Sequence, residues 1–329
     1  MNGKRDIDKL ISVIVPTYNV EINKLRNTIE SVLRQTYHPI EVIVIDDGSQ
    51  TPFGSLDTAV FESYVEQNYP HHNIQFILPG KHLGLAGVKN LGIQKSRGEF
   101  IAFLDCGDWW DQHKLKKQIA HFRQTASDCG LVYCGAKIVN ITTGNAEILY
   151  EMYPSAKGSD LCKDFLIYNK ITGSNSSVLI KRECFKKVGL FYDKDDIPED
   201  IEMWGRIAKS YTIDYVKECL VYIEKDLNSM SNNPEKKEQT YLRYYKLKEF
   251  ELKKYGLWNR AMSQYYSVIG KKYILKKKYI KGILFFATAF RYGLYKQTLL
   301  KFTGSICEAV FNTYKITKAA HYIRNKIIS

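Results

Sequence analysis

Two aspartates, Asp105 and Asp108, follow an apolar run in the segment FLDCGDWW, and Gly107 lies between them. Burying carboxylates at the end of a strand is costly unless they are hydrogen-bonded or hold a cation. A second acidic pair, Asp46 and Asp47, follows the apolar run IEVIVI. Two carboxylates near a diphosphate are compatible when a divalent cation lies between them. The segments therefore indicate either a site for a metal and a phosphorylated ligand or two ordinary acidic turns.

A glycine-rich segment, GKHLGLAGVKN, lies between these two acidic segments in the sequence. Gly84 and Gly87 open a predicted helix, whose free N–H groups and positive dipole end favour phosphate oxygens. Each glycine alone is equally consistent with a loop of tight backbone geometry. Asp47 could accept hydrogen bonds from a base or a sugar. Taken together, the acidic and glycine-rich segments favour a nucleotide-type site over turns alone.

Four short apolar runs predict the strands that position these segments: residues 11–15, 40–45, 74–78 and 100–104. They are nearly continuous and rich in β-branched and aromatic residues, which is typical of strands covered on both faces. Two amphipathic helical stripes lie between or after them: Leu25, Ile29, Val32 and Leu33, and then Leu115, Ile119 and Phe122. This alternation predicts a doubly wound α/β sheet that binds ligands at the carboxyl ends of its strands.

These segments, in this order, resemble the family 2 glycosyltransferases, inverting enzymes with a GT-A fold that take sugars from nucleoside diphosphates. The matching stretches are ISVIVPTYN, IESVLRQTY, IEVIVIDDGS, GLAGVKNLGI, SRGEFIAFLDCGDWW and GSNSSVLIKRECFKKVGLFYDKDDIPEDIEMWGRIA. The resemblance implies a mostly parallel sheet with a C-terminal helical appendage. It also implies transfer of a hexose or N-acetylhexosamine, from a UDP-sugar to a glycan or lipid-linked acceptor, in bacterial surface-polysaccharide synthesis.

The resemblance places Pro16 and Tyr18 at the nucleobase and Asp47 at the base or ribose. Asp105 stands where the family has the Asp-x-Asp element that meets ribose and metal. With the glycine-rich segment included, the predicted donor-binding residues are Pro16, Tyr18, Asp47, Gly84, Lys89, Asp105 and Asp108.

The chain departs from the family at the metal position. The family usually reads Leu-Asp-x-Asp-Asp, whereas Gly107 stands here in place of the metal-binding carboxylate. We therefore predict that Asp108, together with Asp105, holds Mg²⁺ or Mn²⁺; a weak metal site and a site without metal stay open. Cys106 is not expected to be a nucleophile, because no histidine that could activate it is near in the sequence.

The segment DDIPED precedes a helical pattern, and Asp200 within it matches the family's general base. An inverting transfer needs one base, because the acceptor hydroxyl loses its proton as it attacks the anomeric carbon. Acids and Pro198 in a first helical turn are also explained by the helix dipole. Glu199 either orients the acceptor or caps the helix. Gly173 in GSNSS and Trp109 are further predicted acceptor-binding residues, and SMSNN (229–233) resembles a mobile loop over the donor.

The basic character of the chain lies in its C-terminal region. Residues 232–329 hold 21 lysines and arginines against five glutamates, whereas the whole chain has a net charge of +13. We predict a GT-A domain in residues 1–231, with a nucleotide-sugar-binding half (1–110) and an acceptor half (111–231), and a basic helical region in 232–329. That region suits an anionic membrane surface. An ordinary solvated appendage is the alternative, and nucleic acid is disfavoured because no recognised motif accompanies the charge.

The seven cysteines form no CxxC pair, and the first residues, MNGKRDIDKL, lack the apolar core of a signal peptide. We therefore expect a reduced, cytoplasmic protein. Two other functions stay open. Gly107 would suit a nucleotide-sugar-binding scaffold with weakened catalysis. A nucleotidyltransferase would need a phosphate-gripping, glycine-rich loop after the first strand, which PTYNVEINKLR does not supply.

Overall fold

The computed structural model describes residues 9–142, 145–154, 156–158, 161–194, 196–224, 233–296 and 298–306. The chain divides into two compact units. The described residues of the first unit lie in 9–165, 169–194 and 199–224, and those of the second lie in 166–168, 196–198 and 233–306.

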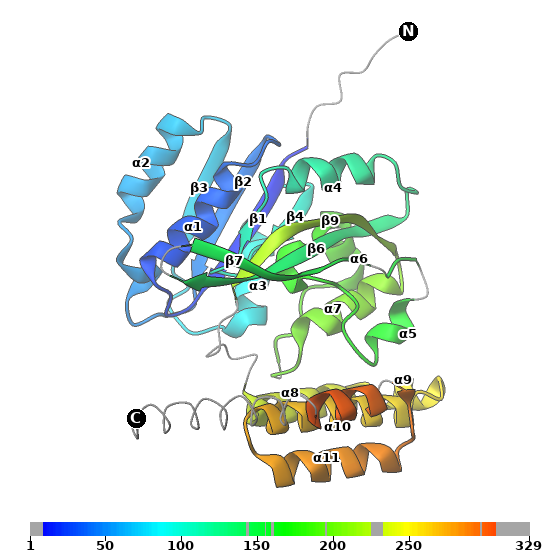
Figure 1. The fold of residues 1–329 in the computed structure, drawn as a ribbon. Coiled ribbons are helices and arrows are strands. Elements are labelled where there is room, and N and C mark those ends of the chain that lie inside the picture. The colour runs from blue at the N-terminus through cyan, green and yellow to red at the C-terminus, as the bar shows by residue number, and fades with distance from the viewer. Residues whose placement is uncertain are drawn as a thin grey trace, which may run out of the picture. The chain divides into compact units, whose positions relative to one another are not determined.

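The first unit is a mixed α/β structure around one sheet (Figure 1). Its strands are β1 (Ile11–Thr17), β2 (Ile40–Asp46), β3 (His72–Ile77), β4 (Phe100–Phe103), β5 (Trp109–Trp110), β6 (Cys129–Thr142), β7 (Asn145–Met152), β8 (Leu179–Lys181) and β9 (Thr212–Glu224). Among the described residues these nine strands follow the order β3-β2-β1-β4-β8-β6-β9-β5, and β7 pairs with β6. Strands β1 to β4 pair in parallel. The predicted α/β class and all four predicted strands are confirmed.

The helices of the first unit connect these strands. They are α1 (Ile22–Leu33), η1 (Pro52–Ser55), α2 (Thr58–Asn68), α3 (Gly84–Lys95), α4 (Lys114–Phe122), α5 (Leu161–Phe165), η2 (Ser174–Ser177), α6 (Arg182–Val188) and α7 (Glu199–Ala208). The predicted stripe of α1 is buried, and so are Leu115 and Ile119 of α4. These helices cover strands that are themselves buried along their length, as β1 and β2 are.

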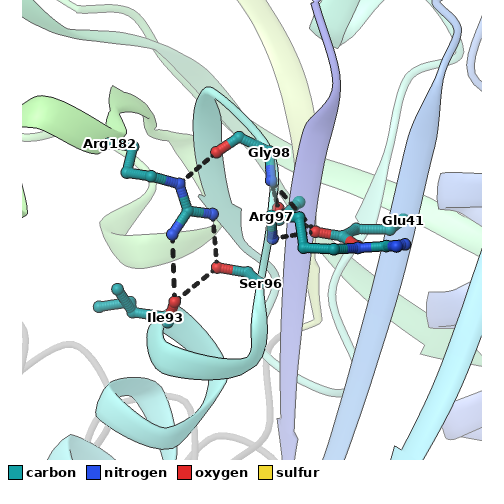
Figure 2. Close-up of polar contacts among 7 residues, drawn as sticks. Glu41, Ile93, Ser96, Arg97, Gly98 and Arg182 are labelled. Carbon is teal, nitrogen blue, oxygen red and sulfur yellow. Dashed lines mark hydrogen bonds and ion pairs between the residues drawn. The ribbon is translucent and has the colours of Figure 1, made fainter.

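A buried polar network ties the turn between α3 and β4 to the amino ends of β1 and β2 (Figure 2). The Glu41 carboxylate accepts from the backbone N–H groups of Arg97 (2.5 Å) and Gly98 (3.2 Å) and from the Ser12 hydroxyl (2.6 Å). Arg182 donates to the Gly98 carbonyl and, at 2.8 Å, to the Ser96 hydroxyl. Burial would raise the pKa of Glu41, but these hydrogen bonds hold it below its usual value. The network thus fixes the start of β4, and Asp105 follows the other end of that strand by two residues.

The second unit is helical. It contains α8 (Pro234–Leu247), α9 (Glu249–Lys254), α10 (Trp258–Leu275) and α11 (Tyr279–Arg291). Helices α10 and α11 approach closely at Gly282. A Cβ atom at this position would lie 3.0 Å from the Gly270 carbonyl oxygen and 2.6 Å from the Ile274 side chain, so a larger residue would clash. Within this unit the Tyr245 hydroxyl donates to the Ile167 carbonyl at 2.5 Å. No helix in the described ranges has the length and apolar character needed to cross a bilayer.

Candidate active site

Four segments at the carboxyl ends of β1, β2, β3 and β4 carry the polar residues predicted from the sequence. These ends share one edge of the sheet because the four strands are parallel neighbours. Two elements from the second half of the unit, η2 and the start of α7, contribute the remaining side chains. The site has three parts. They are the Asp47 cluster (Asp47 with His82, Leu83 and Gly84), the Asp105–Asp108 loop and the Lys89–Glu199 pair.

Asp47 is buried and caps the start of α3. Its two carboxylate oxygens accept from the backbone N–H groups of Leu83 (2.6 Å) and Gly84 (2.9 Å), and one lies 3.0 Å from His82 Nδ1. We expected the Gly84 N–H group to be free for phosphate; in this structure it donates to Asp47. The negative carboxylate takes the place at the helix N-terminus that an anion would otherwise occupy.

The two residues predicted at the nucleobase lie on either side of the end of β1. Pro16 is buried within β1, where it pairs in register with Ile45. Tyr18, just beyond the strand, is 50% exposed, and its ring centroid lies 5.3 Å from that of His82. Tyr18 is thus available to a ligand next to the Asp47 cluster, whereas Pro16 shapes the strand beneath it.

The loop after β4 is held by two hydroxyl groups. The Ser176 hydroxyl donates to Asp108 Oδ2 at 2.6 Å and accepts from the Asp105 N–H group at 3.1 Å. The Thr28 hydroxyl donates to the Asp108 carbonyl at 2.9 Å and accepts from the Gly107 N–H group at 3.0 Å. Gly107 has a φ of +101°, which other residues rarely adopt, and this turn brings Asp108 to Ser176.

The donor set of this loop suits a hard divalent cation. Burial raises the pKa of both aspartates above the usual value, and the charge of Asp105 adds to the increase at Asp108. A cation between the carboxylates would offset that repulsion, and Mg²⁺ commonly binds one or two carboxylates plus substrate phosphates. Across the described residues, no group of three or more histidine, cysteine or acidic side chains could hold a metal. Asp105 and Asp108 are thus the residues of this loop that would hold such an ion.

Cys106 in the same loop is a free, partly buried thiol. Burial raises its pKa to about 12, so the thiolate needed for nucleophilic attack is scarce at neutral pH. That Cys106 is not a nucleophile stays a prediction.

Lys89, on α3, is completely buried and pairs with Glu199 at the start of α7. Its Nζ atom lies 2.7 Å from Glu199 Oε1 and 5.3 Å from the ring centroid of Phe191. Burial would lower the pKa of Lys89, but the charges of Glu199 and Asp105 outweigh burial and raise it. We predicted that Lys89 binds the donor; in this structure its ammonium group neutralises Glu199.

Asp200 lies beside this pair. Its Oδ2 atom accepts from the Asn169 amide at 2.9 Å, and its Oδ1 atom accepts from the Ile201 N–H group at 2.7 Å. Burial and the charge of Glu199 raise the pKa of Asp200 to about 6, against the opposing effect of Lys89. A carboxylate with this pKa is a stronger base than usual and is still largely ionised at neutral pH.

The predicted acceptor-binding residues lie in different surroundings. Trp109 is partly exposed, and its ring stacks on Tyr222 at 5.4 Å with an interplanar angle of 2°. Gly173 is buried just before η2. Glu199 is held by Lys89, as described above. Of the segment SMSNN, residues 229–232 lie outside the described residues, and Asn233 caps α8 by accepting from the Lys236 N–H group at 3.0 Å.

Sequence reasoning missed three polar side chains that position the predicted ones: Thr28, Asn169 and Ser176. Each reaches its partner from a distant part of the chain, as Ser176 reaches Asp108 across 68 positions. The segment GSNSS was the available signal for Ser176, because a run of small polar residues in an otherwise apolar region needs partners for its hydroxyl groups.

The sequence model described as "Glycosyl transferase family 2" matches residues 12–189, which is more than half of the 329 residues. The chain belongs to glycosyl transferase family 2. An uncharacterised glycosyltransferase of Rickettsia typhi is 26% identical over 216 residues. That alignment covers 64% of this chain and 63% of the relative, so the match spans less than two thirds of the relative's length. Glycosyltransferase GlyA of Streptococcus pneumoniae is 34% identical over 120 residues, which cover 36% of this chain and 16% of that protein.

A solved structure supports the fold. The mannosyltransferase PcManGT from Pyrobaculum calidifontis, determined in complex with GDP-Man and Mn²⁺, matches with a TM-score of 0.59 at 14% sequence identity. The match covers 95% of this chain and 84% of that one. At this identity the likeness shows the fold alone, and it confirms the predicted GT-A-type sheet with C-terminal helices.

Proposed function

We propose that this family 2 member is an inverting glycosyltransferase that uses Asp200 as its general base. The observation that carries the proposal is the cluster of three partly exposed acids, Asp200, Glu199 and Asp105, around the buried Lys89, in which Asp200 has a pKa of about 6. Glu199 and Asp200 belong to the segment that resembles the family's Glu-Asp motif. A base of this strength can take the acceptor's proton at neutral pH in a single displacement, without a covalent intermediate.

The surrounding residues have separate tasks in this mechanism. Lys89 keeps Glu199 ionised, because it outweighs the burial that would raise the pKa of Glu199. The paired Glu199 then remains an acceptor of hydrogen bonds, which suits it to orient a hydroxyl group of the acceptor. Asp105 and Asp108 would hold Mg²⁺ or Mn²⁺ with the donor diphosphate. When bound, such an ion offsets the negative charge that grows on the departing diphosphate.

The donor is proposed to be a nucleotide sugar, and a UDP-sugar is the first candidate. The group transferred is proposed to be a hexose or an N-acetylhexosamine. Tyr18 and Asp47 would lie at the nucleoside, and Gly84, whose N–H group donates to Asp47, would contribute by holding that carboxylate in place at the start of α3. The acceptor is proposed to be a glycan or lipid-linked saccharide of a surface polysaccharide. In this assignment residues 1–110 bind the donor, residues 111–231 bind the acceptor, and residues 232–329 form a basic accessory region.

A thermal-shift panel tests donor binding first. UDP-glucose, UDP-galactose, UDP-N-acetylglucosamine and GDP-mannose are compared with and without Mn²⁺, since a ligand raises apparent stability by mass action. We expect at least one nucleotide sugar to raise the melting temperature, with a larger shift when Mn²⁺ is present. A shift that is identical in EDTA would remove the metal from Asp105 and Asp108.

Asp200→Asn then separates binding from transfer. We expect this variant to keep the donor-dependent thermal shift and to lose release of the nucleoside diphosphate by a factor of about 100 or more. Asp128→Asn, at an exposed position before β6, is the control and should keep full activity. Unimpaired release by Asp200→Asn would end the role of Asp200 as base. Donor binding without any release by the wild type would favour the scaffold.

We also propose that the second unit touches an anionic membrane from the cytoplasmic side. The outward side of α11 exposes Ile280 (80%), Ile283 (48%) and Leu284 (61%). Exposed cations stand at its two ends, with Lys276 before the helix and Arg291 at its last position. Apolar side chains flanked by cations suit the interface of an anionic bilayer, where each cation contributes about 1 kcal/mol.

Vesicle flotation tests this surface. The full chain should float with vesicles of phosphatidylcholine and phosphatidylserine at low salt, less with phosphatidylcholine alone, and less again when Ile280 and Leu284 are both changed to serine. Equal flotation of the double variant would contradict the assignment of α11.

A further inference from the structure

One row of side chains crosses four neighbouring strands of the first unit. Trp109 on β5 lies opposite Tyr222 on β9, Tyr222 lies opposite Lys137 on β6, and Lys137 lies opposite Glu151 on β7. Residues directly opposite one another in paired strands point to the same face of the sheet. Adjacent strands are about 4.8 Å apart, so these four side chains form a regular line across the sheet.

This row lies on the face turned away from the main core. The neighbouring row, which points to the other face, consists of Trp110, Val221, Ala136 and Met152. The first three are buried in the main core, and Met152 packs against it. In contrast, Trp109, Tyr222 and Lys137 are partly exposed, and Glu151 is exposed. The row is therefore open to solvent where its alternate neighbours are not.

The row begins next to Asp108, a proposed metal ligand, and its side chains are held in place before any ligand arrives. Trp109 follows Asp108 directly in the chain. Its ring stacks on Tyr222, and Lys137 Nζ lies 5.1 Å from the Tyr222 ring centroid. Lys137 Nζ also lies 3.8 Å from Glu151 Oε1, and the hydroxyl of Tyr153 donates to Glu151 at 2.5 Å. Because each side chain is fixed by the next, a ligand would lose little free energy in ordering them.

The chemistry of the row fits a saccharide. The indole N–H and the ammonium group donate hydrogen bonds, the carboxylate accepts them and the phenol does both, so the row offers donors and acceptors to a hydroxyl-rich sugar. The charges of Lys137 and Glu151 cancel, so the row does not favour a charged chain. Neighbouring members of the row are about one strand spacing, about 4.8 Å, apart, so a chain molecule lying along the row would be contacted at regular intervals.

We infer that the row Trp109–Tyr222–Lys137–Glu151 is the subsite for an uncharged oligosaccharide, the growing chain whose end accepts the sugar. The inference rests on the proposed transferase function, and it adds the class of acceptor and the surface that binds it. Several linked sugar units would lie across β5, β9, β6 and β7, with the reacting end nearest Asp108.

Saturation-transfer NMR on the full chain tests the subsite with named probes: cellotetraose, chitotetraose and glucose. We expect the wild type to bind at least one tetrasaccharide and to bind glucose much more weakly. Tyr222→Leu, which keeps an apolar side chain but removes the ring and hydroxyl, should weaken tetrasaccharide binding about fivefold. Glu151→Gln, at an exposed position that is safer for folding, should weaken it as well. Tyr150→Leu is the control, because Tyr150 is also exposed on β7 but lies one position away and so on the opposite face.

The donor-dependent thermal shift is measured on each variant to separate this inference from the proposed function. It should stay unchanged in Tyr222→Leu and Glu151→Gln, since neither residue is assigned to the donor. No tetrasaccharide binding by the wild type would overturn the subsite, and so would equal binding by wild type, Tyr222→Leu and Glu151→Gln. If the variants melt at a lower temperature but bind the tetrasaccharide as well as the wild type does, the row only stabilises the sheet. If the wild type itself shows no donor-dependent thermal shift, that result would instead count against the proposed function.

Discussion

Replacing Lys89 with methionine should destabilise the fold through the charge that it leaves behind. Lys89 is completely buried, and its ammonium group lies 2.7 Å from the Glu199 carboxylate, which is 16% exposed. Methionine is unbranched and apolar, so it can fill most of the space of the lysine stem without creating a large cavity. The variant therefore removes a cation and little else, and Glu199 becomes a buried carboxylate without its partner.

The size of the effect follows from the burial of the pair. Removing one partner of a buried ion pair costs about 3–5 kcal/mol, because the other charge stays desolvated. Glu199 keeps a small exposed fraction and also accepts a hydrogen bond from Asn175, so we expect about 3 kcal/mol, at the low end of that range. Replacing both charges, as in Lys89→Met with Glu199→Gln, should restore about half or more of this loss.

Urea unfolding of the two single variants and the double variant measures the cycle, with Lys116→Met on the exposed face of α4 as the control. The control should change the free energy of unfolding by less than about 0.5 kcal/mol. In Lys89→Met the pKa of Glu199 rises, so the folded state gains stability from protonation at low pH and loses it as pH rises through that pKa. The loss should thus be smaller at pH 5 than at pH 8. A loss no larger than that of the control, or a double variant as unstable as Lys89→Met, would refute the reasoning.

Three further changes test other parts of the structure. Because the pKa of Asp200 is about 6, nucleoside diphosphate release should rise about tenfold per pH unit below 6 and level off above it; a flat profile from pH 5 to 7 would contradict this. Glu41→Gln should cost about 3 kcal/mol in urea unfolding at pH 7. Since the folded pKa of Glu41 is lowered, its contribution is lost as pH falls below about 4, and an equal cost at pH 7 and pH 3 would argue against the network. Gly282→Ala should cost about 1–3 kcal/mol through the clash between α10 and α11. Gly304→Ala, with open space around it, should be neutral or slightly stabilising, and similar effects of both alanines would contradict the close approach.

The strands that are buried on both faces could be predicted from the sequence, because a short, continuous apolar run is typical of such a strand. The apolar run at 40–45 became β2, Ile40–Asp46, and the stripe through Leu25 and Ile29 became the buried side of α1. Strands β6 and β9 were not predicted, although they are the longest of the described sheet. They pair across about 80 positions with several register shifts, so no local pattern identifies them as partners.

The site was predictable in its residues and less so in their partners. Asp105 and Asp200 were selected from separate segments, and the structure brings both to the buried ammonium group of Lys89. The sequence offered no reason to expect that Asp47 would use both oxygens on the start of α3, because that contact depends on where β2 ends relative to the next loop. Helix capping and ligand binding demand the same residue types, and only the three-dimensional arrangement separates them.

Gly107 shows why a departure from a family pattern does not by itself imply lost function. Where the family has a second carboxylate, this chain has a glycine with a φ of +101°, and the turn that it permits brings the next residue, Asp108, to the Ser176 hydroxyl at 2.6 Å. Thr28 holds the same turn from the other side through the Gly107 N–H group. A carboxylate is therefore still supplied beside Asp105, one position later in the chain and positioned by a hydroxyl from η2. If the metal site is retained, its geometry should depend on Ser176 as much as on the two aspartates, because Ser176 contacts both Asp108 and the backbone of Asp105.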